Sequence, residues 1–303
     1  MSSKLNQWIS AARLRTIPLS ISGILVGSFA TINQKMFDLP IFLLAIFTTI
    51  SYQVLSNFAN DYGDGIKGTD NNRIGPKRAV QSGEISAKEM KKGIFLLSTI
   101  SFILTFLLVF ISFGKDINNL ILFIALGLAA IISAIKYTVG ENAYGYMGFG
   151  DLFVFLFFGL LSVLGSNFLF TSMFNSVLIY PACSIGLLSV GVLNLNNMRD
   201  VENDEKSEKK TIVVKLGIFK SKLYHCFLIF MSIIFISILH FKLNSSSLMF
   251  LGLIVSLIVL LTIHLILILN ITNPEKFDSQ LKPLVFSTFF YSIILSLHFI
   301  DII

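Results

Sequence analysis

The chain has 303 residues, of which 54% are hydrophobic and only 13% are charged. Soluble domains of this length carry about a quarter charged residues, and the mean hydropathy here is +0.81. This composition excludes a soluble enzyme, a disordered chain and a nucleic-acid-binding protein, although the formal net charge is +6. It indicates a protein that crosses a membrane several times, with the lipid bilayer as its surroundings. No obligate protein partner is inferred.

Nine apolar runs are long enough, or nearly so, to cross a bilayer as helices. In chain order they cover residues 17–32, 41–58, 93–113, 118–135, 151–164, 177–195, 224–241, 248–269 and 284–300. The start of the fifth run is the least well marked, because three glycines crowd it. Since the connecting segments are short, we expect an all-α polytopic membrane protein with a single domain over residues 1–303, made of two similar halves, about 13–145 and 146–303.

The basic residues between the runs are distributed unevenly. Twenty of the 23 Lys and Arg residues lie in the N-terminal tail and in every second connecting segment, and the alternate segments hold only Lys35, Lys115 and Lys242. Cytoplasmic loops of membrane proteins carry the excess of Lys and Arg. We therefore expect nine helices in the inner (cytoplasmic) membrane of a cell, with the N-terminus in the cytoplasm and the C-terminus outside.

An acidic cluster lies at the predicted cytoplasmic end of the second apolar run. Asn57, Asp61 and Asp64 stand at positions i, i+4 and i+7, so they share one face if the helix continues past the membrane. Two carboxylates and a carboxamide would then meet at the membrane surface.

A second cluster of the same kind follows the sixth run. Asn196, Asp200 and Asp204 stand at positions i, i+4 and i+8 and again share one helical face. Four crossings separate the two clusters, and because this number is even, both clusters open to the same side of the membrane.

The chemistry of these clusters indicates a site for a metal and an anion. Oxygen ligands without His or Cys suit Mg²⁺, which binds few carboxylates and shares phosphate oxygens with its substrate. Arg73 and Arg78 follow the first cluster and Lys210 follows the second, and cations beside carboxylates are typical of a receptor for Mg²⁺-bound diphosphate. Loops that serve membrane topology alone need Lys and Arg but gain little from Asp, so the Asp pairs favour the functional interpretation.

These residues resemble the two aspartate-rich motifs of the UbiA superfamily of intramembrane prenyltransferases. The first motif, N-D-x-x-D-x-x-x-D, matches Asn60, Asp61 and Asp64, with a glycine in place of the third Asp. The second motif, D-x-x-x-D, matches Asp200 and Asp204. Within the superfamily, the displaced third acid and the run Asn196-Asn197-x-Arg199 are similar to the 1,4-dihydroxy-2-naphthoate polyprenyltransferases.

The resemblance implies nine helices around a central cavity, with both motifs at its cytoplasmic mouth and Mg²⁺ as the cofactor. It implies catalytic, metal-binding roles for Asp61, Asp64, Asp200 and Asp204, with Asn57, Asn60 and Asn196 as further metal ligands. Residues expected to bind the diphosphate are Arg73, Arg78 and Lys210. Residues expected near the aromatic acceptor are Arg15, Lys136 and Tyr137, whereas Asp151 receives no role.

The reaction implied by the resemblance is an electrophilic prenylation. A polyprenyl group passes from an allylic polyprenyl diphosphate to 1,4-dihydroxy-2-naphthoate, with loss of CO₂ and diphosphate, in the step of menaquinone biosynthesis that leads to demethylmenaquinone. An enzyme of the same superfamily acting on 4-hydroxybenzoate or homogentisate is the main alternative. A phosphotransferase for CDP-alcohols and a membrane transporter are weaker alternatives, because the second acidic motif is distant in the chain and the ionisable groups avoid the midplane of the bilayer.

Overall fold

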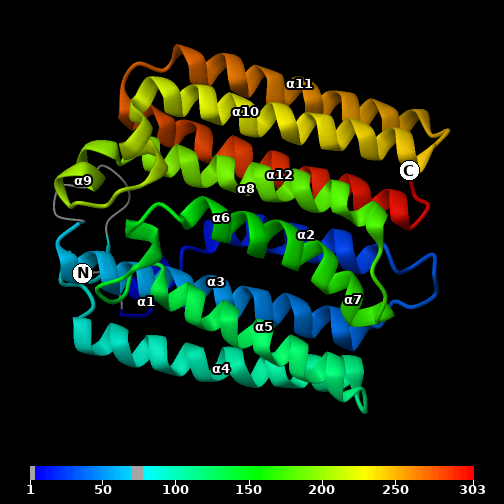
Figure 1. Ribbon diagram of the computed structural model, residues 1–303, viewed down its shortest axis with the longest axis horizontal. Helices are drawn as coiled ribbons and strands as arrows, with labels where there is room; N and C mark the ends of the chain where they lie inside the picture. The colour runs from blue at the N-terminus through cyan, green and yellow to red at the C-terminus, as the bar shows by residue number, and fades with distance from the viewer. Residues whose placement is uncertain (1–3, 70–77) are drawn as a thin grey trace.

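The computed structural model describes residues 4–69 and 78–303, and all regular secondary structure in these ranges is helical. Nine helical stretches within them are long and apolar enough to cross a membrane. Figure 1 shows these stretches side by side, with the two chain ends at opposite ends of the bundle. The prediction of an all-α protein with nine crossing helices is therefore confirmed for the described part of the chain. Arg73, predicted to bind the diphosphate, falls outside the described residues.

Five of the nine crossings consist of one long helix, of which α10 is kinked at Gly217, and four combine shorter pieces. The elements are, in chain order, α1 (Lys4–Ala12), η1 (Leu14–Thr16), α2 (Ile17–Phe29), α3 (Leu39–Lys67), α4 (Ala87–Phe113), α5 (Ile117–Lys136), η2 (Tyr144–Tyr146), α6 (Gly150–Val154), η3 (Phe155–Gly165), α7 (Ser166–Thr171), η4 (Ser176–Leu178), α8 (Ile179–Arg199), α9 (Val201–Lys206), α10 (Ile212–Leu243), α11 (Leu248–Asn270), η5 (Pro274–Phe277) and α12 (Asp278–Phe299).

Helix α3 shows why the helices extend beyond the apolar runs. It begins after Asp38, whose carboxylate accepts a hydrogen bond from the Ile41 amide, as expected for a helix N-cap. It continues to Lys67 and stops at Gly68, which takes the left-handed conformation (φ 74°) that glycine adopts without strain. The last turns of α3 are polar and carry the first acidic cluster, so the cluster lies on a helix and not in a loop.

The fifth crossing differs from the others because η3 is wound as a π-helix. It packs closely on α8: a Cβ atom on Gly159 would lie only 2.6 Å from the carbonyl oxygen of Ala182. Glycine is therefore required at this contact. The close approach brings η3 against the helix that leads into the second acidic cluster.

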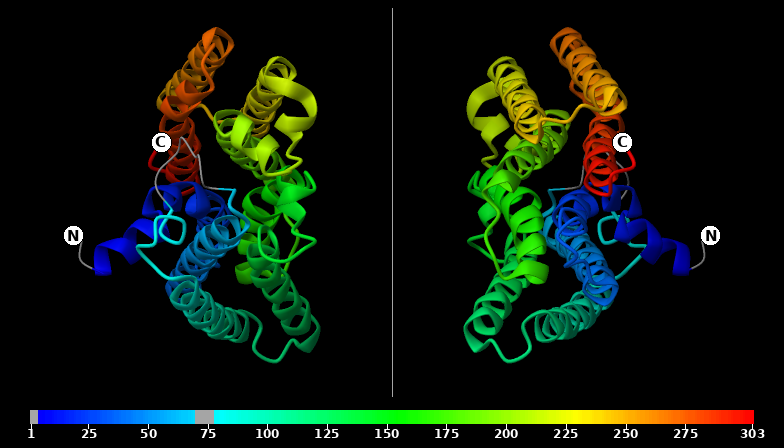
Figure 2. Two further views of the ribbon diagram at one scale, coloured as in Figure 1. Left: turned by 90° about the vertical axis from the view of Figure 1, so that its left-hand side faces the viewer. Right: turned by 90° about the vertical axis from the view of Figure 1, so that its right-hand side faces the viewer.

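The helices are arranged around a centre when the bundle is seen from its end (Figure 2). Helix α2 packs on α3, η3 and α12, while α4 packs on α3 and α5, and α8 packs on η3 and α12. Helices α10 and α11 lie outside this ring, against α8 and α12 respectively. The C-terminal ends of α3 and α8, which carry the two acidic motifs, lie at the same end of the bundle (Figure 1). This end is called the motif end below. The division into two similar halves stays a prediction.

Candidate active site

A cavity of about 400 Å³ extends between α2, α3, α5, η3 and α8 and reaches the ends of α3 and α8. Both acidic clusters line it, through Asn57, Asn60, Asp64, Asn196, Asp200 and Asp204. Among the described residues, α10, α11 and α12 contribute nothing to its wall. The fold thus brings the two clusters to one cavity although more than a hundred residues separate them in the chain.

Asp64, in the last turn of α3, is only 2% exposed. The Tyr146 hydroxyl donates a hydrogen bond of 2.9 Å to its Oδ1. Two cations approach its Oδ2: Arg78 Nη2 at 3.5 Å and Lys209 Nζ at 3.8 Å. The carboxylate therefore stands between one neutral donor and two buried positive charges.

Lys209 connects the two clusters electrostatically. Its Nζ lies 3.8 Å from Asp64 Oδ2 and 3.6 Å from Asp204 Oδ1, and the side chain is buried in the cavity wall. Burial alone lowers the pKa of Lys209, but the carboxylates of Asp64 and Asp204 outweigh this effect and raise that pKa above its usual value. The ammonium group remains charged at neutral pH and lies between acids from both clusters.

Asp200 is held by its neighbour in the chain. Arg199 donates from Nε and Nη2 to the two Asp200 oxygens, each at 2.7 Å, and from Nη1 to Asp278 Oδ1 at 2.6 Å. The Arg199 side chain is fully buried. A two-pronged pair of this kind fixes the plane of a carboxylate, so Arg199 determines how Asp200 faces the cavity.

Direct hydrogen bonds also join the chain segments that follow the two clusters. Asn203 donates from Nδ2 to the carbonyl oxygen of Thr69, and Thr69 Oγ1 lies 2.6 Å from the Tyr146 hydroxyl. The Lys210 amide donates to the Tyr146 carbonyl oxygen at 3.0 Å. Tyr146 therefore contacts Asp64 through its hydroxyl and the segment after α9 through its backbone. Burial together with the Asp64 charge raises the pKa of Tyr146.

Asp61 lies on the same helix but points away from the cavity. Its two oxygens accept hydrogen bonds of 3.0 and 2.9 Å from the amides of Ala79 and Val80, and it is 1% exposed. It does not belong to the cavity wall, where Asn60 takes its place beside Asp64. The prediction that Asp61 shares the cavity-facing side of the helix with Asn57 and Asp64 is therefore wrong. The peptide N–H groups of Ala79 and Val80 bind the Asp61 carboxylate on the other side of α3.

The other predicted residues fall into two groups. Arg15 and Tyr137 line the cavity, and burial raises the pKa of Tyr137 to about 12, so its phenol stays protonated and can donate a hydrogen bond. Lys136 and Lys210 are exposed and do not belong to the cavity wall. Lys136 was predicted to contact the acceptor and Lys210 the diphosphate, and neither side chain reaches the cavity in this structure.

Three residues of the site were not assigned a role from the sequence: Tyr146, Arg199 and Lys209. Each had a signal nearby. Tyr146 precedes Gly148, a glycine with φ 89° that turns the chain into the fifth crossing, and Arg199 directly precedes an acid of the second motif. Lys209 directly precedes Lys210, for which the sequence predicted the diphosphate-binding role. Only the path of the chain after α9 makes Lys209 buried and Lys210 exposed.

The oxygen donors of the cavity fit a magnesium ion. Within the described ranges, no three carboxylate, His or Cys side chains form a ready-made metal centre. Mg²⁺ needs less than this, because it usually binds one or two carboxylates together with waters and substrate phosphates. Asp64 and Asp204 already accommodate a cation between them, the Lys209 ammonium. The donor chemistry therefore suits Mg²⁺ that is shared with a diphosphate.

Comparison with known sequences shows the family. Residues 20–294 match the UbiA prenyltransferase family. The chain belongs to this family. The match includes α10, α11 and most of α12, which lie outside the cavity wall, so it covers most of the helical bundle and not the acidic motifs alone.

Individual relatives within the UbiA family are similar over most of their length. The 1,4-dihydroxy-2-naphthoate octaprenyltransferase of Haemophilus influenzae is 46% identical over 232 residues, which is 76% of this chain and 75% of that protein. The enzyme of the same name from Escherichia coli is 40% identical over 245 residues, or 80% and 79% of the two chains.

Solved structures of UbiA homologues share the fold. A homologue from Archaeoglobus fulgidus bound to GPP and Mg²⁺ has a TM-score of 0.65 at 14% identity, covering 96% of this chain and 99% of that one. An apo structure of a homologue from Aeropyrum pernix K1 has the same TM-score at 12% identity and covers 100% of both chains. At these identities the likeness shows the UbiA fold alone.

Proposed function

We propose that the protein transfers a polyprenyl group from an allylic polyprenyl diphosphate to 1,4-dihydroxy-2-naphthoate, with release of CO₂ and diphosphate. The product leads to demethylmenaquinone in menaquinone biosynthesis. The reaction class rests on one observation, which is that two acidic clusters and the buried cations Arg78 and Lys209 face a single cavity. The acceptor is proposed from the relatives that are 46% and 40% identical and carry this activity in their names.

Different residues around the cavity would bind the metal and the diphosphate. Those that would hold Mg²⁺ are Asn57, Asn60, Asp64, Asn196, Asp200 and Asp204. When bound, the metal neutralises charge that develops on the leaving diphosphate. Asp61 stays outside this ligand set, because two backbone amides occupy its carboxylate. We assign it the task of fixing the segment at Ala79 and Val80, next to Arg78.

Arg78 and Lys209 would bind the diphosphate oxygens. Both are buried at Asp64, within 4 Å of its carboxylate, and fixed charges in a water-poor site stabilise developing charge strongly. As the C–O bond of the donor breaks, these cations keep the negative charge on the leaving group. Lys210, expected from the sequence to share this role, instead supports Tyr146 through its backbone amide.

The allylic cation is then captured by the electron-rich ring of the acceptor. Tyr137 and Tyr144 line the cavity with their ring centroids 5.3 Å apart in an edge arrangement. Aromatic faces stabilise cations. Because the Tyr137 hydroxyl stays protonated, it does not act as a phenolate nucleophile that competes with the acceptor for the allylic cation. Arg15, near the motif end of the cavity, offers a positive charge to the carboxylate of the acceptor.

The polyprenyl tail extends into the bilayer in this proposal. A cavity of about 400 Å³ lies at the small end of the range for drug-sized ligands, so a long tail must leave it. Burial of the tail in lipid contributes about 0.8 kcal/mol per CH₂ group. The excess of Lys and Arg in the segments of the motif end favours a cytoplasmic mouth, a cytoplasmic N-terminus and an external C-terminus in the inner membrane.

A transfer assay tests this proposal. Purified protein in lipid nanodiscs receives Mg²⁺, a radiolabelled polyprenyl diphosphate and one acceptor at a time: 1,4-dihydroxy-2-naphthoate, 4-hydroxybenzoate or homogentisate. We expect prenylated product from the naphthoate, loss of activity when Mg²⁺ is chelated, and recovery when Mg²⁺ is returned. Product from one of the other acceptors alone would assign the protein to the alternative acceptor class.

A further inference from the structure

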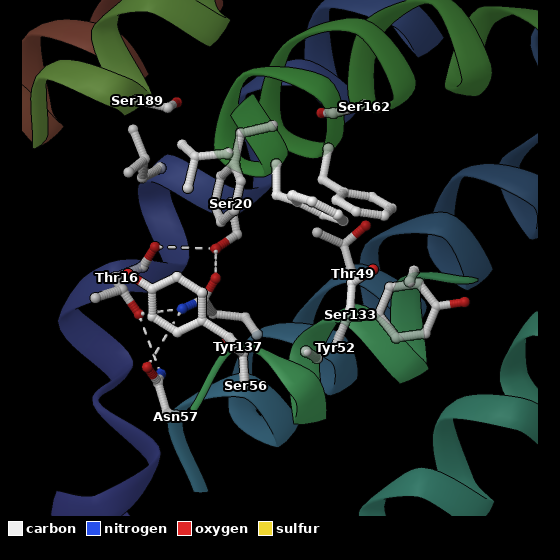
Figure 3. Close-up of a pocket in the computed structure, with 18 of the residues that line it drawn as sticks. Thr16, Ser20, Thr49, Tyr52, Ser56, Asn57, Ser133, Tyr137, Ser162 and Ser189 are labelled. Atoms are coloured by element: carbon white, nitrogen blue, oxygen red, sulfur yellow. Dashed lines mark hydrogen bonds between the residues drawn. The ribbon is translucent and has the colours of Figure 1, made fainter. Parts of the chain in front are cut away.

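A polar cluster lies in the cavity wall deeper in the bundle than the acids. This Gln53 cluster consists of Thr16 at the end of η1, Ser20 in the first turn of α2, and Gln53 and Asn57 on α3. Gln53 is one helical turn, about 6 Å, from Asn57, on the side away from Asp64. Figure 3 shows Thr16, Ser20 and Asn57 together on one side of the cavity.

The hydrogen bonds of the cluster fix the orientation of the Gln53 amide. The Thr16 hydroxyl donates its only proton to the Arg13 carbonyl oxygen at 2.9 Å, so Thr16 Oγ1 accepts from Gln53 Nε2, 3.1 Å away. On the other side of the amide, Ser20 Oγ donates to Gln53 Oε1 at 2.7 Å. The amide nitrogen therefore faces Thr16, and the amide oxygen faces Ser20.

Gln53 Oε1 keeps the capacity to accept a second hydrogen bond. A carboxamide oxygen has two lone pairs, and the contact with Ser20 uses one of them among the described residues. Gln53 is half-buried and lines the cavity. A glutamine that served only to join α2 and α3 would lie hidden between the two helices, whereas Gln53 forms part of the cavity wall.

The residue before Gln53 also lines the cavity, but its hydroxyl group already has partners within the protein. The Tyr52 hydroxyl lies 2.5 Å from Thr105 Oγ1 and 3.4 Å from the Gly127 carbonyl oxygen, so it is occupied by its neighbours. Phe153 and Phe157 present apolar surface to the cavity. Thr49, Ser56 and Ser162 add hydroxyl groups to the same cavity (Figure 3). Gln53 differs from them because two hydrogen bonds fix the orientation of its acceptor atom, and an oriented acceptor beside apolar surface is suited to an aromatic ring that carries a hydroxyl group.

We propose that Gln53 Oε1 accepts a hydrogen bond from a ring hydroxyl of the aromatic acceptor, so that Gln53 is an acceptor-specificity residue. This inference rests on the proposed function. In 1,4-dihydroxy-2-naphthoate the 1-hydroxyl adjoins the carboxylate and bonds to it internally, which leaves the 4-hydroxyl in need of a partner. Arg13 and Arg15, which line the cavity nearer its mouth, are placed for the carboxylate end of the ring.

Binding without turnover tests this inference directly. Equilibrium dialysis under anaerobic conditions, with the full chain in nanodiscs and no Mg²⁺, compares 1,4-dihydroxy-2-naphthoate with 1-hydroxy-2-naphthoate, which lacks the 4-hydroxyl. Loss of one hydrogen bond corresponds to about tenfold in affinity, so the wild type should prefer the dihydroxy acid by this factor. Gln53→Met should bind both acids equally, and Gln53→Asn, which withdraws the oxygen by one methylene, should do the same.

Tyr52→Phe is the matched control, because it removes a hydroxyl from the neighbouring cavity residue whose partners lie on α4 and α5. It should keep the wild-type preference. In steady-state assays Gln53→Met should raise the KM for the acceptor about tenfold and leave the KM for the prenyl diphosphate unchanged. No preference in the wild type, or an undiminished preference in both Gln53 variants, would overturn the inference. Failure of the wild type to prenylate any of these acids would overturn the proposed function instead, and the dialysis result would still decide the role of Gln53.

Discussion

Arg199 Nη1 lies 2.6 Å from Oδ1 of Asp278, although 79 positions separate the two residues. Arg199 also holds both oxygens of Asp200. Asp278 begins α12, a helix that contributes nothing to the cavity wall among the described residues. The C-terminal part of the bundle therefore reaches Asp200 through the buried guanidinium group of Arg199, and we expect Asp278 to influence metal binding through this contact.

Replacing Asp278 tests this connection. Asp278→Asn keeps the shape of the side chain but removes the charge that anchors Arg199, so Asp200 should lose its fixed orientation. Removing a residue that orients a metal ligand typically lowers metal affinity by about 10- to 100-fold, and we expect the lower end of this range. The measurement is calorimetric titration with Mg²⁺ in the presence of inorganic diphosphate.

Asp116→Asn is a suitable control for that titration. Asp116 caps α5 by accepting a hydrogen bond from the Asn119 amide, and Asn is an equally good cap. The control should bind Mg²⁺ as the wild type does. Equal Mg²⁺ affinity in Asp278→Asn and the control would show that Arg199 positions Asp200 without help from α12.

The adjacent lysines provide a second matched pair. Lys209→Gln removes the buried cation between Asp64 and Asp204, whereas Lys210→Gln alters an exposed side chain outside the cavity wall. We expect turnover to fall by about 100-fold or more in the first variant, as is typical when one stabilising group for developing charge is lost. The second variant should stay near the wild-type rate, and the reverse pattern would restore the role that the sequence suggested for Lys210.

Replacing Asp64 by Asn should impair Mg²⁺ binding and turnover, whereas replacing Asp61 by Asn should lower stability. Asp64→Asn should abolish Mg²⁺ binding and nearly all turnover, since Asp64 faces the cavity. Asp61→Asn turns an amide group toward the Ala79 and Val80 N–H groups, which costs about 1–3 kcal/mol of stability for an unsatisfied buried donor. Its melting temperature should therefore fall, while its Mg²⁺ affinity is retained. Loss of Mg²⁺ binding in Asp61→Asn, with stability unchanged, would make Asp61 a metal ligand after all.

The orientation in the membrane can be tested with single cysteines in a variant that lacks Cys183 and Cys226. Gln81 lies in an exposed segment between α3 and α4, and Ser246 lies between α10 and α11 at the other end of the bundle. A membrane-impermeant thiol reagent added to intact cells should label Ser246→Cys and not Gln81→Cys. Labelling of Gln81→Cys alone would invert the proposed topology.

The fold was largely predictable because its main determinant is local. Apolar runs of about membrane length mark helices, and all nine predicted runs coincide with crossing helices. The helix ends were less predictable, since polar residues continue α3 to Lys67, and α10 begins at Ile212 with a kink at Gly217 before the predicted apolar run. Helical order beyond the apolar run depends on packing and capping, which hydropathy does not report.

Within the site, the sequence predicted which segments meet but not which side chains face the cavity. Residues three and four positions apart both share a helical face, so Asn60 and Asp61 were equal candidates until the position of the cavity was known. Lys209 and Lys210 differ only in the direction of the chain after α9. The Gln53 cluster and the Arg199–Asp278 contact join distant segments, and no local pattern indicates such pairs.

One measurement tests the central claim most directly. 1,4-Dihydroxy-2-naphthoate labelled in its carboxyl carbon is incubated with purified protein, Mg²⁺ and a polyprenyl diphosphate labelled with a second isotope, and both released CO₂ and prenylated product are counted. Substitution at the carbon that bears the carboxylate predicts one CO₂ for each prenyl group transferred. Prenylated product that retains the carboxyl label would contradict the proposed reaction.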